Sequence, residues 1–330
     1  MLTRLCFFSR YNWVVNLVLC SSFTLLSGCS VPSVWNDEAE VTQEIQAVAP
    51  VSGDMQISTL TEQQVKFTVL ASLPSDVSET SGLAMRYGKL WTINDSGDGA
   101  FLYKLNLSNQ FIETKLKVTD AVNRDWESLA QDDTYLYIAD CGNNSGKRDT
   151  FQIYQVPWHE IDIAPNGSRL SSDRINIKLE KQTADLEAYE HNYDCEAITM
   201  VDNQLWLFSK NWQDQQTQLY QAEFGTSPQL LKAQQTLPVQ GLITAVDYHQ
   251  PSGQLALLGY SKQRLFGHAF IWIFDVVGGE VDLSHAKYYQ LPEYSQWEGL
   301  LWKNDKTLLI SAESSPLSSA ALAEVVLPSH

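Results

Sequence analysis

The hydrophobic positions of this chain fall into short runs, and one pairing of such runs occurs five times. In each copy, a run that opens with an acidic or small residue is followed by a polar turn and then by a second apolar run. The clearest copies open at Glu127, Glu196 and Glu298, and weaker copies open at Ser81 and Thr244. A repeat of about 50 residues built from short hydrophobic runs is typical of β-propellers, in which each repeat forms one four-stranded blade.

The length of the repeat region sets the expected number of blades. Five blades of about 53 residues would account for residues 65–330, so we predict an all-β, five-bladed β-propeller. The interval between the second and third copies is longer than the others, which indicates an insertion at residues 158–173 and 183–193. A six-bladed propeller is the alternative if this insertion contains a further blade. No helical pattern is found after the N-terminal segment.

The two ends of the repeat region each carry a strand pattern without a partner in the repeat. These are residues 65–73 and residues 321–327. We expect them to pair, so that the first strand becomes the outer strand of the last blade and closes the ring without an exposed edge. The fourth strands of the other blades are expected near Ile112, Ile175, Leu230 and Tyr288.

The N-terminal segment has the features of a bacterial lipoprotein signal peptide. Arg4 and Arg10 give it a basic start, and residues 13–26 are apolar but short for a membrane span. The motif that ends at Cys29, Leu-Ser-Gly-Cys, is a lipobox. A retained transmembrane anchor is the alternative interpretation.

This motif predicts the domains and the location of the protein. Residues 1–28 would be the signal peptide, residues 29–64 the lipidated Cys29 with a flexible tether, and residues 65–330 the propeller. Acyl chains on Cys29 would hold the protein on a membrane. Ser30 after the cysteine resembles signals that sort lipoproteins to the outer membrane of Gram-negative cells. We expect the periplasmic face, with the cell surface as the alternative.

The charge of the chain narrows its expected partners. With 39 acidic and 22 basic residues, the formal net charge is −17 at pH 7. Phosphate binding needs a basic surface, so the sequence predicts no nucleic-acid partner. The acidic charge favours a divalent cation or a basic ligand instead, and an envelope protein or a small ligand is the expected partner. The same acidity would also keep an extracytoplasmic protein soluble.

The cysteines predict one disulfide. Cys6 and Cys20 lie in the signal peptide and Cys29 would carry lipid, which leaves Cys141 and Cys195. Cys141 follows the second strand of one blade and Cys195 precedes the innermost strand of the next, so both belong to the same face. In an oxidising compartment we expect them to pair. Two unrelated free thiols are the alternative.

The repeat also gathers polar residues at one end of the propeller. Innermost strands line the central channel, so the residues that open them meet at one mouth, and Glu127, Glu196 and Glu298 should surround it. The second strand of each blade returns to the same face. The residues at or just beyond its end join the ring: Asn94, Asp95, Asp140, Ser209, Lys210, Ser311 and Glu313.

Oxygen-bearing side chains in this ring suit a hard cation such as Ca²⁺, which is the predicted cofactor. The carboxylates would repel one another unless a cation or a basic side chain compensated them. Asn and Asp are also common in turns, so their presence in the loops after the second strands does not require a cation. The predicted metal ligands are Glu127, Asp140, Glu196, Asp247 and Glu298. The residues predicted to contact a ligand are Asn94, Asp95, Asn144, Arg148, Lys210 and Glu313.

Catalytic residues are not identified from the sequence. There is no Gly-x-Ser-x-Gly nucleophile motif, and the six histidines lack the spacing of metal ligands. The first hypothesis is therefore a binding module of the cell envelope. Paired carboxylates also serve as acid and base, so a divalent-metal-dependent hydrolase of an ester, lactone or phosphoester is the alternative.

Several short motifs resemble those of bacterial secreted propellers. The motifs are Trp91-Thr-Ile-Asn-Asp-Ser-Gly, Asp125-Trp-Glu-Ser-Leu-Ala, Tyr137-Ile-Ala-Asp-Cys-Gly-Asn-Asn and Asp194-Cys-Glu-Ala-Ile-Thr. They look like the SdiA-regulated propeller family and the phytase-like propeller proteins. The resemblance implies Ca²⁺ binding, carried by Asn94, Asp95, Glu127, Asp140, Asn144, Glu196 and Glu298. Cys141 stands where relatives tend to have an acidic residue or glycine.

Overall fold

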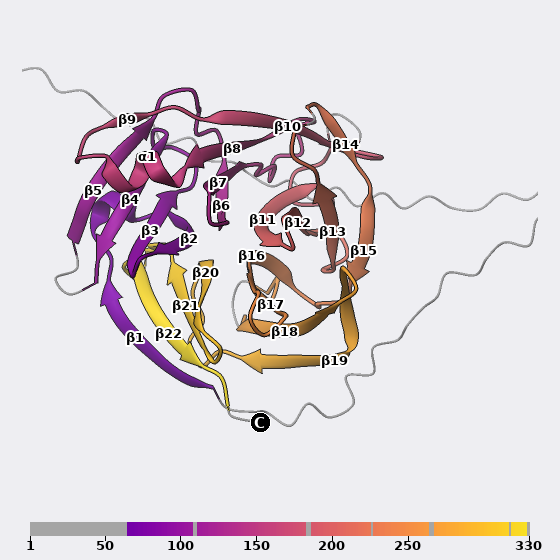
Figure 1. Ribbon diagram of the computed structural model, residues 1–330. Helices are drawn as coiled ribbons and strands as arrows, with labels where there is room; N and C mark the ends of the chain where they lie inside the picture. Colours follow the sequence, from indigo (N-terminus) through magenta and orange to yellow (C-terminus); the bar gives the residue numbers. More distant parts are fainter. Residues whose placement is uncertain are drawn as a thin grey trace, which may run out of the picture. The chain divides into compact units, whose positions relative to one another are not determined.

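Five β-sheets make up the described part of the chain, which in this computed structural model is residues 65–328 without 108–110, 183–185, 226, 264–266 and 317. They stand around a central axis as the blades of a propeller (Figure 1). The prediction of an all-β, five-bladed propeller is confirmed, and the six-bladed alternative is wrong. The predicted signal peptide, Cys29 and tether lie outside the described residues.

In each of four blades, four antiparallel strands follow one another outward from the channel. Blade 1 consists of β2 (Thr80–Arg86), β3 (Lys89–Asn94), β4 (Phe101–Asn106) and β5 (Phe111–Val118). Blade 2 consists of β6 (Trp126–Gln131), β7 (Tyr135–Asp140), β8 (Phe151–Pro157) and β10 (Asp173–Leu179). Blade 3 consists of β11 (Asp194–Val201), β12 (Gln204–Lys210), β13 (Thr217–Ala222) and β15 (Ala233–Leu237). Blade 4 consists of β16 (Leu242–His249), β17 (Gln254–Tyr260), β18 (Ala269–Val277) and β19 (Glu280–Gln290).

Blade 5 is assembled from both ends of the described chain. Its inner strands are β20 (Trp297–Asn304), β21 (Thr307–Ala312) and β22 (Ala321–Val326), and its outer strand is β1 (Lys66–Ser72). The antiparallel register of β1 and β22 runs from the Lys66–Val326 pair to the Ser72–Ala321 pair. The predicted closure of the ring is therefore confirmed.

The predicted insertion is present and links neighbouring blades. Between β8 and β10 it forms the short helix α1 (Trp158–Ile163) and the strand β9 (Arg169–Leu170), which pairs in parallel with β5 of blade 1. The expectation of no helix is thus wrong for these six residues. A further helical turn, η1, spans Ser75–Val77. Within the described ranges, no helix combines the length and the apolar character that crossing a bilayer requires.

One predicted fourth strand belongs to a different blade. Leu230 lies in β14 (Gln229–Leu231), which pairs in parallel with β10 of blade 2. The fourth strand of blade 3 is β15, whose sequence Ala-Gln-Gln-Thr-Leu buries only its last residue. The prediction chose the more apolar run near Leu230, but the strand that pairs with β13 is the more polar β15.

The core is divided into five clusters, one between each two neighbouring blades. The inner two strands of each blade face a neighbouring blade on both sides, so nearly all of their residues are buried, as in β12 and β21. Outer strands such as β5 alternate buried and exposed residues instead. This difference in hydrophobic pattern is what made the inner strand pairs readable from the sequence.

Candidate functional site

All five innermost strands break register with their neighbours at the same place. A β-bulge falls between Thr80 and Leu83 in β2, and bulges of the other blades each skip one residue. The skipped residues are Glu127 in β6, Glu196 in β11, Thr244 in β16 and Glu298 in β20. A bulge leaves one residue out of the ladder and redirects its side chain. The residues that open the five sequence repeats are thus the ones that the bulges redirect.

Three of these residues line a cavity at one end of the channel. Glu127, Glu196 and Glu298 are only 5%, 1% and 7% exposed, and they share a cavity of about 830 Å³. In blades 1 and 4, the equivalent residues are Ser81 and Thr244, and their hydroxyl groups form hydrogen bonds to the neighbouring blade. Ser81 Oγ donates to the carbonyl of Glu127 (2.5 Å), and Thr244 Oγ1 donates to the carbonyl of Trp297 (2.7 Å). Each hydroxyl therefore ties its innermost strand to the next blade.

Lys210 is a buried basic residue of this cavity. Its Nζ lies 3.1 Å from Glu196 Oε2 and lies over the rings of Trp212 (5.1 Å) and Tyr260 (5.5 Å). Burial by itself would lower the pKa of Lys210, but the carboxylates of Glu196 and Glu298 outweigh it and raise that pKa well above its usual value. Lys210 is therefore charged and lies against Glu196, whose own pKa is raised well above its usual value because burial outweighs the charge of Lys210.

A second group of carboxylates lies where blades 1 and 2 meet. One oxygen each of Asp95, Asp125 and Glu127 lies within 4.8 Å of the others. Glu127 Oε1 is buried and has no hydrogen-bond partner among the described residues. Burial and the neighbouring carboxylates raise the pKa of Glu127 well above its usual value, and burial together with Asp125 raises the pKa of Asp95 to about 7. Lys210 and Arg148 lower the pKa values of Asp95 and Asp125, but they offset the burial and repulsion of the cluster only in part.

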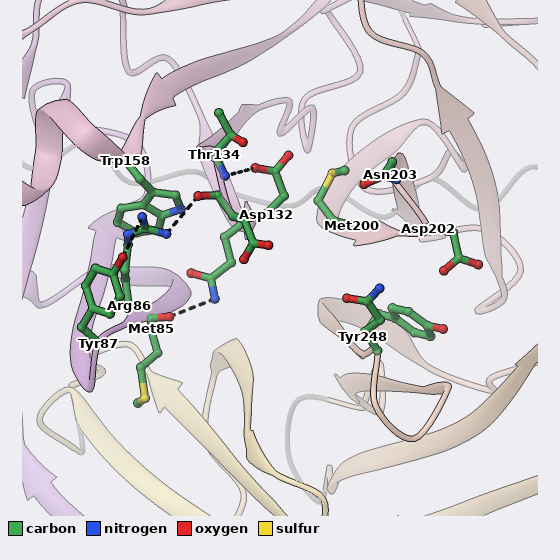
Figure 2. Close-up of a pocket in the computed structure, with 13 residues that line it drawn as sticks. Met85, Arg86, Tyr87, Asp132, Thr134, Trp158, Met200, Asp202, Asn203 and Tyr248 are labelled. Atoms are coloured by element: carbon green, nitrogen blue, oxygen red, sulfur yellow. Dashed lines mark hydrogen bonds between the residues drawn. The ribbon is translucent and has the colours of Figure 1, made fainter.

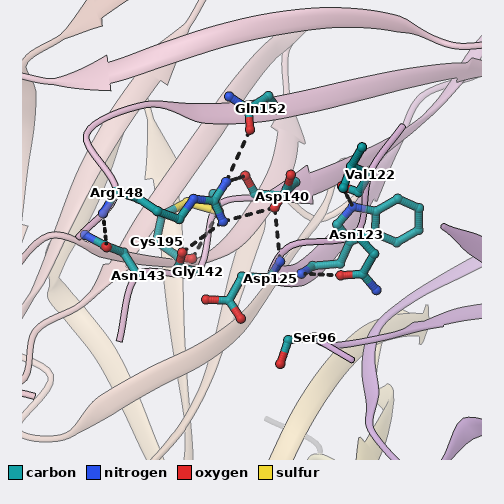
Figure 3. A network of polar contacts seen from close by, with 12 residues as sticks. Ser96, Val122, Asn123, Asp125, Asp140, Gly142, Asn143, Arg148, Gln152 and Cys195 are labelled. Atoms are coloured by element: carbon teal, nitrogen blue, oxygen red, sulfur yellow. Dashed lines mark hydrogen bonds and ion pairs between the residues drawn. A yellow bond between two sulfur atoms is a disulfide. The ribbon is translucent and has the colours of Figure 1, made fainter. Parts of the chain in front are cut away.

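A polar network beneath this cluster fixes the loop after β7 (Figure 3). Arg148 is ion-paired with Asp140 (3.0 Å) and donates to the carbonyl of Gly142 (3.0 Å), while Asp140 Oδ1 accepts from the backbone NH of Asp125 (3.2 Å). The loop therefore packs Gly142 directly against the carboxylates of Asp125 and Glu127, where a Cβ atom would collide with both.

The predicted disulfide is confirmed and belongs to the same network. Cys141 and Cys195 are bonded across 54 residues of sequence, with their Cα atoms 5.2 Å apart. Cys141 precedes Gly142, and Cys195 precedes Glu196. The bond therefore joins the loop of blade 2 to the bulge of blade 3.

Blade 5 contributes a further pair of acidic residues, Glu298 and Glu313. Glu298 lies at the bulge of β20, and Glu313 follows β21, held by a backbone hydrogen bond from its NH to the carbonyl of Gln296 (3.0 Å). Glu313 is 9% exposed. Burial, with the neighbouring charge of Glu298, raises the pKa of Glu313 to about 9, and burial raises that of Glu298 to about 7 although Lys210 opposes it.

The structure brings most of the predicted site residues together. Asp140 and Arg148 lie in the supporting network instead of lining the cavity. Asn94 donates to the carbonyl of Asp76 (2.8 Å) and to Asp98 Oδ2 (3.0 Å), so it shapes the loop after β3. The predicted residues that line the cavity are Asp95, Glu127, Asn144, Glu196, Lys210, Glu298 and Glu313.

Asp247 is not part of this ring. It lies three residues beyond Thr244 on β16, towards the hairpin end of the strand. Its Oδ2 accepts from the NH of Trp302 (2.7 Å) and its Oδ1 from the NH of Tyr248 (3.0 Å). Asp247 therefore joins blade 4 to blade 5 away from the predicted metal ligands, and its placement at the mouth was wrong.

Asp125 and several aromatic residues complete the site, although they were not among the predicted ligands. Tyr260 ends β17, at the position that Lys210 holds in blade 3, so alignment of the repeats could have found it. Tyr189, Trp212 and Tyr294 lie in loops whose sequences do not repeat, so no pattern pointed to them.

The hairpin ends of the inner strands surround a second cavity of about 610 Å³ (Figure 2). Met85, Met200 and Tyr248 line it, and Arg86 lies over the ring of Trp158 (5.1 Å) while paired with Asp162 (2.9 Å). Asp132, Asp133 and Asp202 also line this cavity, whereas Glu127, Glu196 and Glu298 line the other one.

Comparison with known proteins finds only distant structural similarities. No family model matches the sequence, and no curated protein matches it. A putative oxidoreductase (glucose dehydrogenase) of Thermus thermophilus has a similar structure, with 9% identity over 79% of this chain and 100% of that chain (TM-score 0.48). An exo-β-1,3-galactanase of Phanerochaete chrysosporium is 10% identical over 78% of this chain and 64% of that chain (TM-score 0.48). Similarities at this level carry no argument about activity.

Proposed function

We propose that this propeller binds a divalent cation, with Ca²⁺ as the preferred ion, through Asp95, Asp125 and Glu127. The observation that carries the proposal is the buried Glu127 Oε1, which has no hydrogen-bond partner among the described residues and faces two further carboxylates. A buried acceptor without a partner is unfavourable unless a ligand satisfies it. An all-oxygen ligand set suits Ca²⁺ or Mg²⁺ better than Zn²⁺ or Cu²⁺.

The surroundings support binding more than catalysis. Asp140 and Arg148 position the loop that packs against the cluster, as a preformed ligand site needs. The remaining ligands of the cation would come from water and from neighbours such as Asn144. The hydrolase alternative stays a prediction, since no contact described above favours it over binding.

The test is metal content and thermal stability of the purified protein with chelator and with Ca²⁺. We expect one bound ion and a higher melting temperature with Ca²⁺, both lost in Glu127→Gln and Asp125→Asn. Glu280→Gln, which changes an exposed carboxylate of β19, is the matched control and should behave as the unaltered protein. No shift with millimolar Ca²⁺, or an equal shift in all variants, would contradict the proposal.

The lipoprotein prediction is proposed alongside it. The lipobox and Cys29 support a lipid-anchored protein of the outer membrane, with the propeller on the periplasmic side. Incorporation of labelled palmitate that disappears in Cys29→Ala, together with membrane fractionation of both proteins, tests this directly.

A further inference from the structure

Blade 5 contributes two carboxylates to the acidic cavity, Glu298 and Glu313. A divalent cation at Asp95, Asp125 and Glu127 would offset that cluster, and Lys210 is already paired with Glu196. Lys210 offsets the charges of Glu298 and Glu313 only in part. The pair would therefore remain only partly compensated, whether or not that cation is bound.

The two carboxylates are buried but poorly supplied with hydrogen bonds. Tyr260 OH lies 3.5 Å from Glu298 Oε1, at the outer limit of a hydrogen bond, and Glu313 is only 9% exposed. The nearby Glu196 Oε1 is also buried and has no partner among them. Carboxylates withdrawn from water in this way need a donor to remain charged. A positively charged donor would oppose both the burial and the repulsion by Glu298 that raise the pKa of Glu313 to about 9.

Aromatic rings stand beside this pair. Tyr260 and Tyr294 form an edge-to-face contact with centroids 6.4 Å apart, and both line the cavity. The protein's own alkylammonium group, Lys210 Nζ, already lies 5.5 Å from the ring of Tyr260. The faces of such rings attract ammonium groups, and adjacent carboxylates reinforce the attraction. The rings of Tyr260 and Tyr294 therefore favour a second ammonium group beside that of Lys210.

We propose that Glu298, Glu313, Tyr260 and Tyr294 form a subsite for the ammonium end of an alkylamine, supplied either by a lysine side chain or by a small free amine. Three N–H donors of an ammonium group would meet the oxygens of the two carboxylates, and its alkyl chain would lie along the tyrosine rings. The open cavity leaves room for the remainder of the ligand at the surface, where Tyr294 is 47% exposed.

Titration calorimetry of the purified protein tests the subsite with three probes: acetyl-Gly-Lys-Gly-amide, the same peptide with Nε-acetyl-lysine, and n-pentylamine. We expect the charged peptide to bind at least about tenfold more tightly than the acetylated one. Binding of pentylamine as well would identify any alkylamine as the ligand, whereas binding of the peptide alone would identify a lysine side chain.

Variants separate this subsite from the cation site. Glu313→Gln and Glu298→Gln are each expected to weaken binding of the charged peptide at least about tenfold, and Glu280→Gln should leave it unchanged. Both glutamine variants remove a buried carboxylate with a raised pKa, so they should fold. Glu127→Gln should lose the Ca²⁺ effect and keep amine binding. No binding of any amine up to about 10 mM, equal binding of both peptides, or full binding by Glu313→Gln would overturn the proposal.

Discussion

The ammonium nitrogen of Lys210 lies 3.1 Å from Glu196 Oε2, and the two side chains are only 6% and 2% exposed. Breaking a buried pair of this kind by removing one partner typically costs about 3–5 kcal/mol, because the other charge stays buried without compensation. Lys210→Met is therefore expected to lower the free energy of unfolding by about that amount at pH 8, as measured by urea denaturation.

Two further variants check the cause of this loss. Lys210→Met combined with Glu196→Gln removes both charges and should recover most of the lost stability. Lys262→Met removes an exposed lysine of the same cavity and should change the free energy of unfolding by less than about 1 kcal/mol. A similar loss in both lysine variants would show that the Glu196 pair is not the source.

Stability should fall as the pH rises across the neutral range. The pKa of Glu313 is raised from 4.5 to about 9, and those of Glu298 and Asp95 are raised to about 7. Between about pH 5 and 9, the folded protein thus holds protons that the unfolded chain has released, so the free energy of unfolding decreases with pH. In the presence of chelator, we expect a higher melting temperature at pH 5.5 than at pH 8.5.

The same pH series identifies the groups involved. Glu313→Gln should show a smaller fall between pH 5.5 and 8.5, because one titrating carboxyl group has been removed. Saturating Ca²⁺ should also reduce the fall, since it favours the ionised carboxylates. A melting temperature that rises over this interval would contradict the assignment.

Adding a single methyl group at Gly142 should disturb the proposed Ca²⁺ site. A Cβ atom there would collide with the carboxylates of Glu127 and Asp125, and no positive φ adds a second source of strain. We expect Gly142→Ala to displace both carboxylates and to weaken Ca²⁺ binding by about tenfold or more, as followed by calorimetry. Asn144→Ala, in the same loop, removes a single neutral side chain of the cavity and should have a smaller effect. Equal Ca²⁺ affinity in Gly142→Ala and the unaltered protein would argue against the proposed ligands.

Loss of β1 should disrupt the whole propeller. Without residues 66–72, β22 becomes an exposed edge strand, and the cluster between blades 4 and 5 loses the packing of Phe67. A chain that begins at residue 74 is expected to aggregate or to unfold without cooperativity, whereas one that begins at residue 64 should unfold in a single transition. Size-exclusion chromatography and thermal denaturation distinguish the two. A soluble and cooperative shorter chain would show that closure is dispensable.

Much of the fold was readable because inner propeller strands are buried on both faces. Runs such as Leu205–Phe208 are continuously apolar, and their spacing predicted the number of blades. The closing pair of strands was predicted from the two strand patterns that lacked a partner in the repeat. The outer strands are half exposed, so the polar β15 was missed and β14 took its place in the prediction. Helix α1 is a single insertion of six residues and leaves no periodic signal.

The site was predictable to the extent that it follows the repeat. Glu127, Glu196 and Glu298 share a cavity because each sits at the equivalent bulge. Asp247 was misplaced because it falls three positions further along a copy that opens with Thr244, and a shift of that length carries a strand residue towards the other end of the channel. Tyr189, Trp212 and Tyr294 lie in loops unique to each blade, where sequence repeats give no information.

β1 is the first strand of the propeller to leave the ribosome, and β22 is the last. The register that joins them connects Lys66 to Val326, so β1 has no partner until almost the entire chain has been made. Long-range pairing of this kind is slow to form, and an unpaired strand is open to wrong partners while it waits. Ring closure therefore cannot precede the synthesis of β22, and β1 stays exposed to wrong pairing until then.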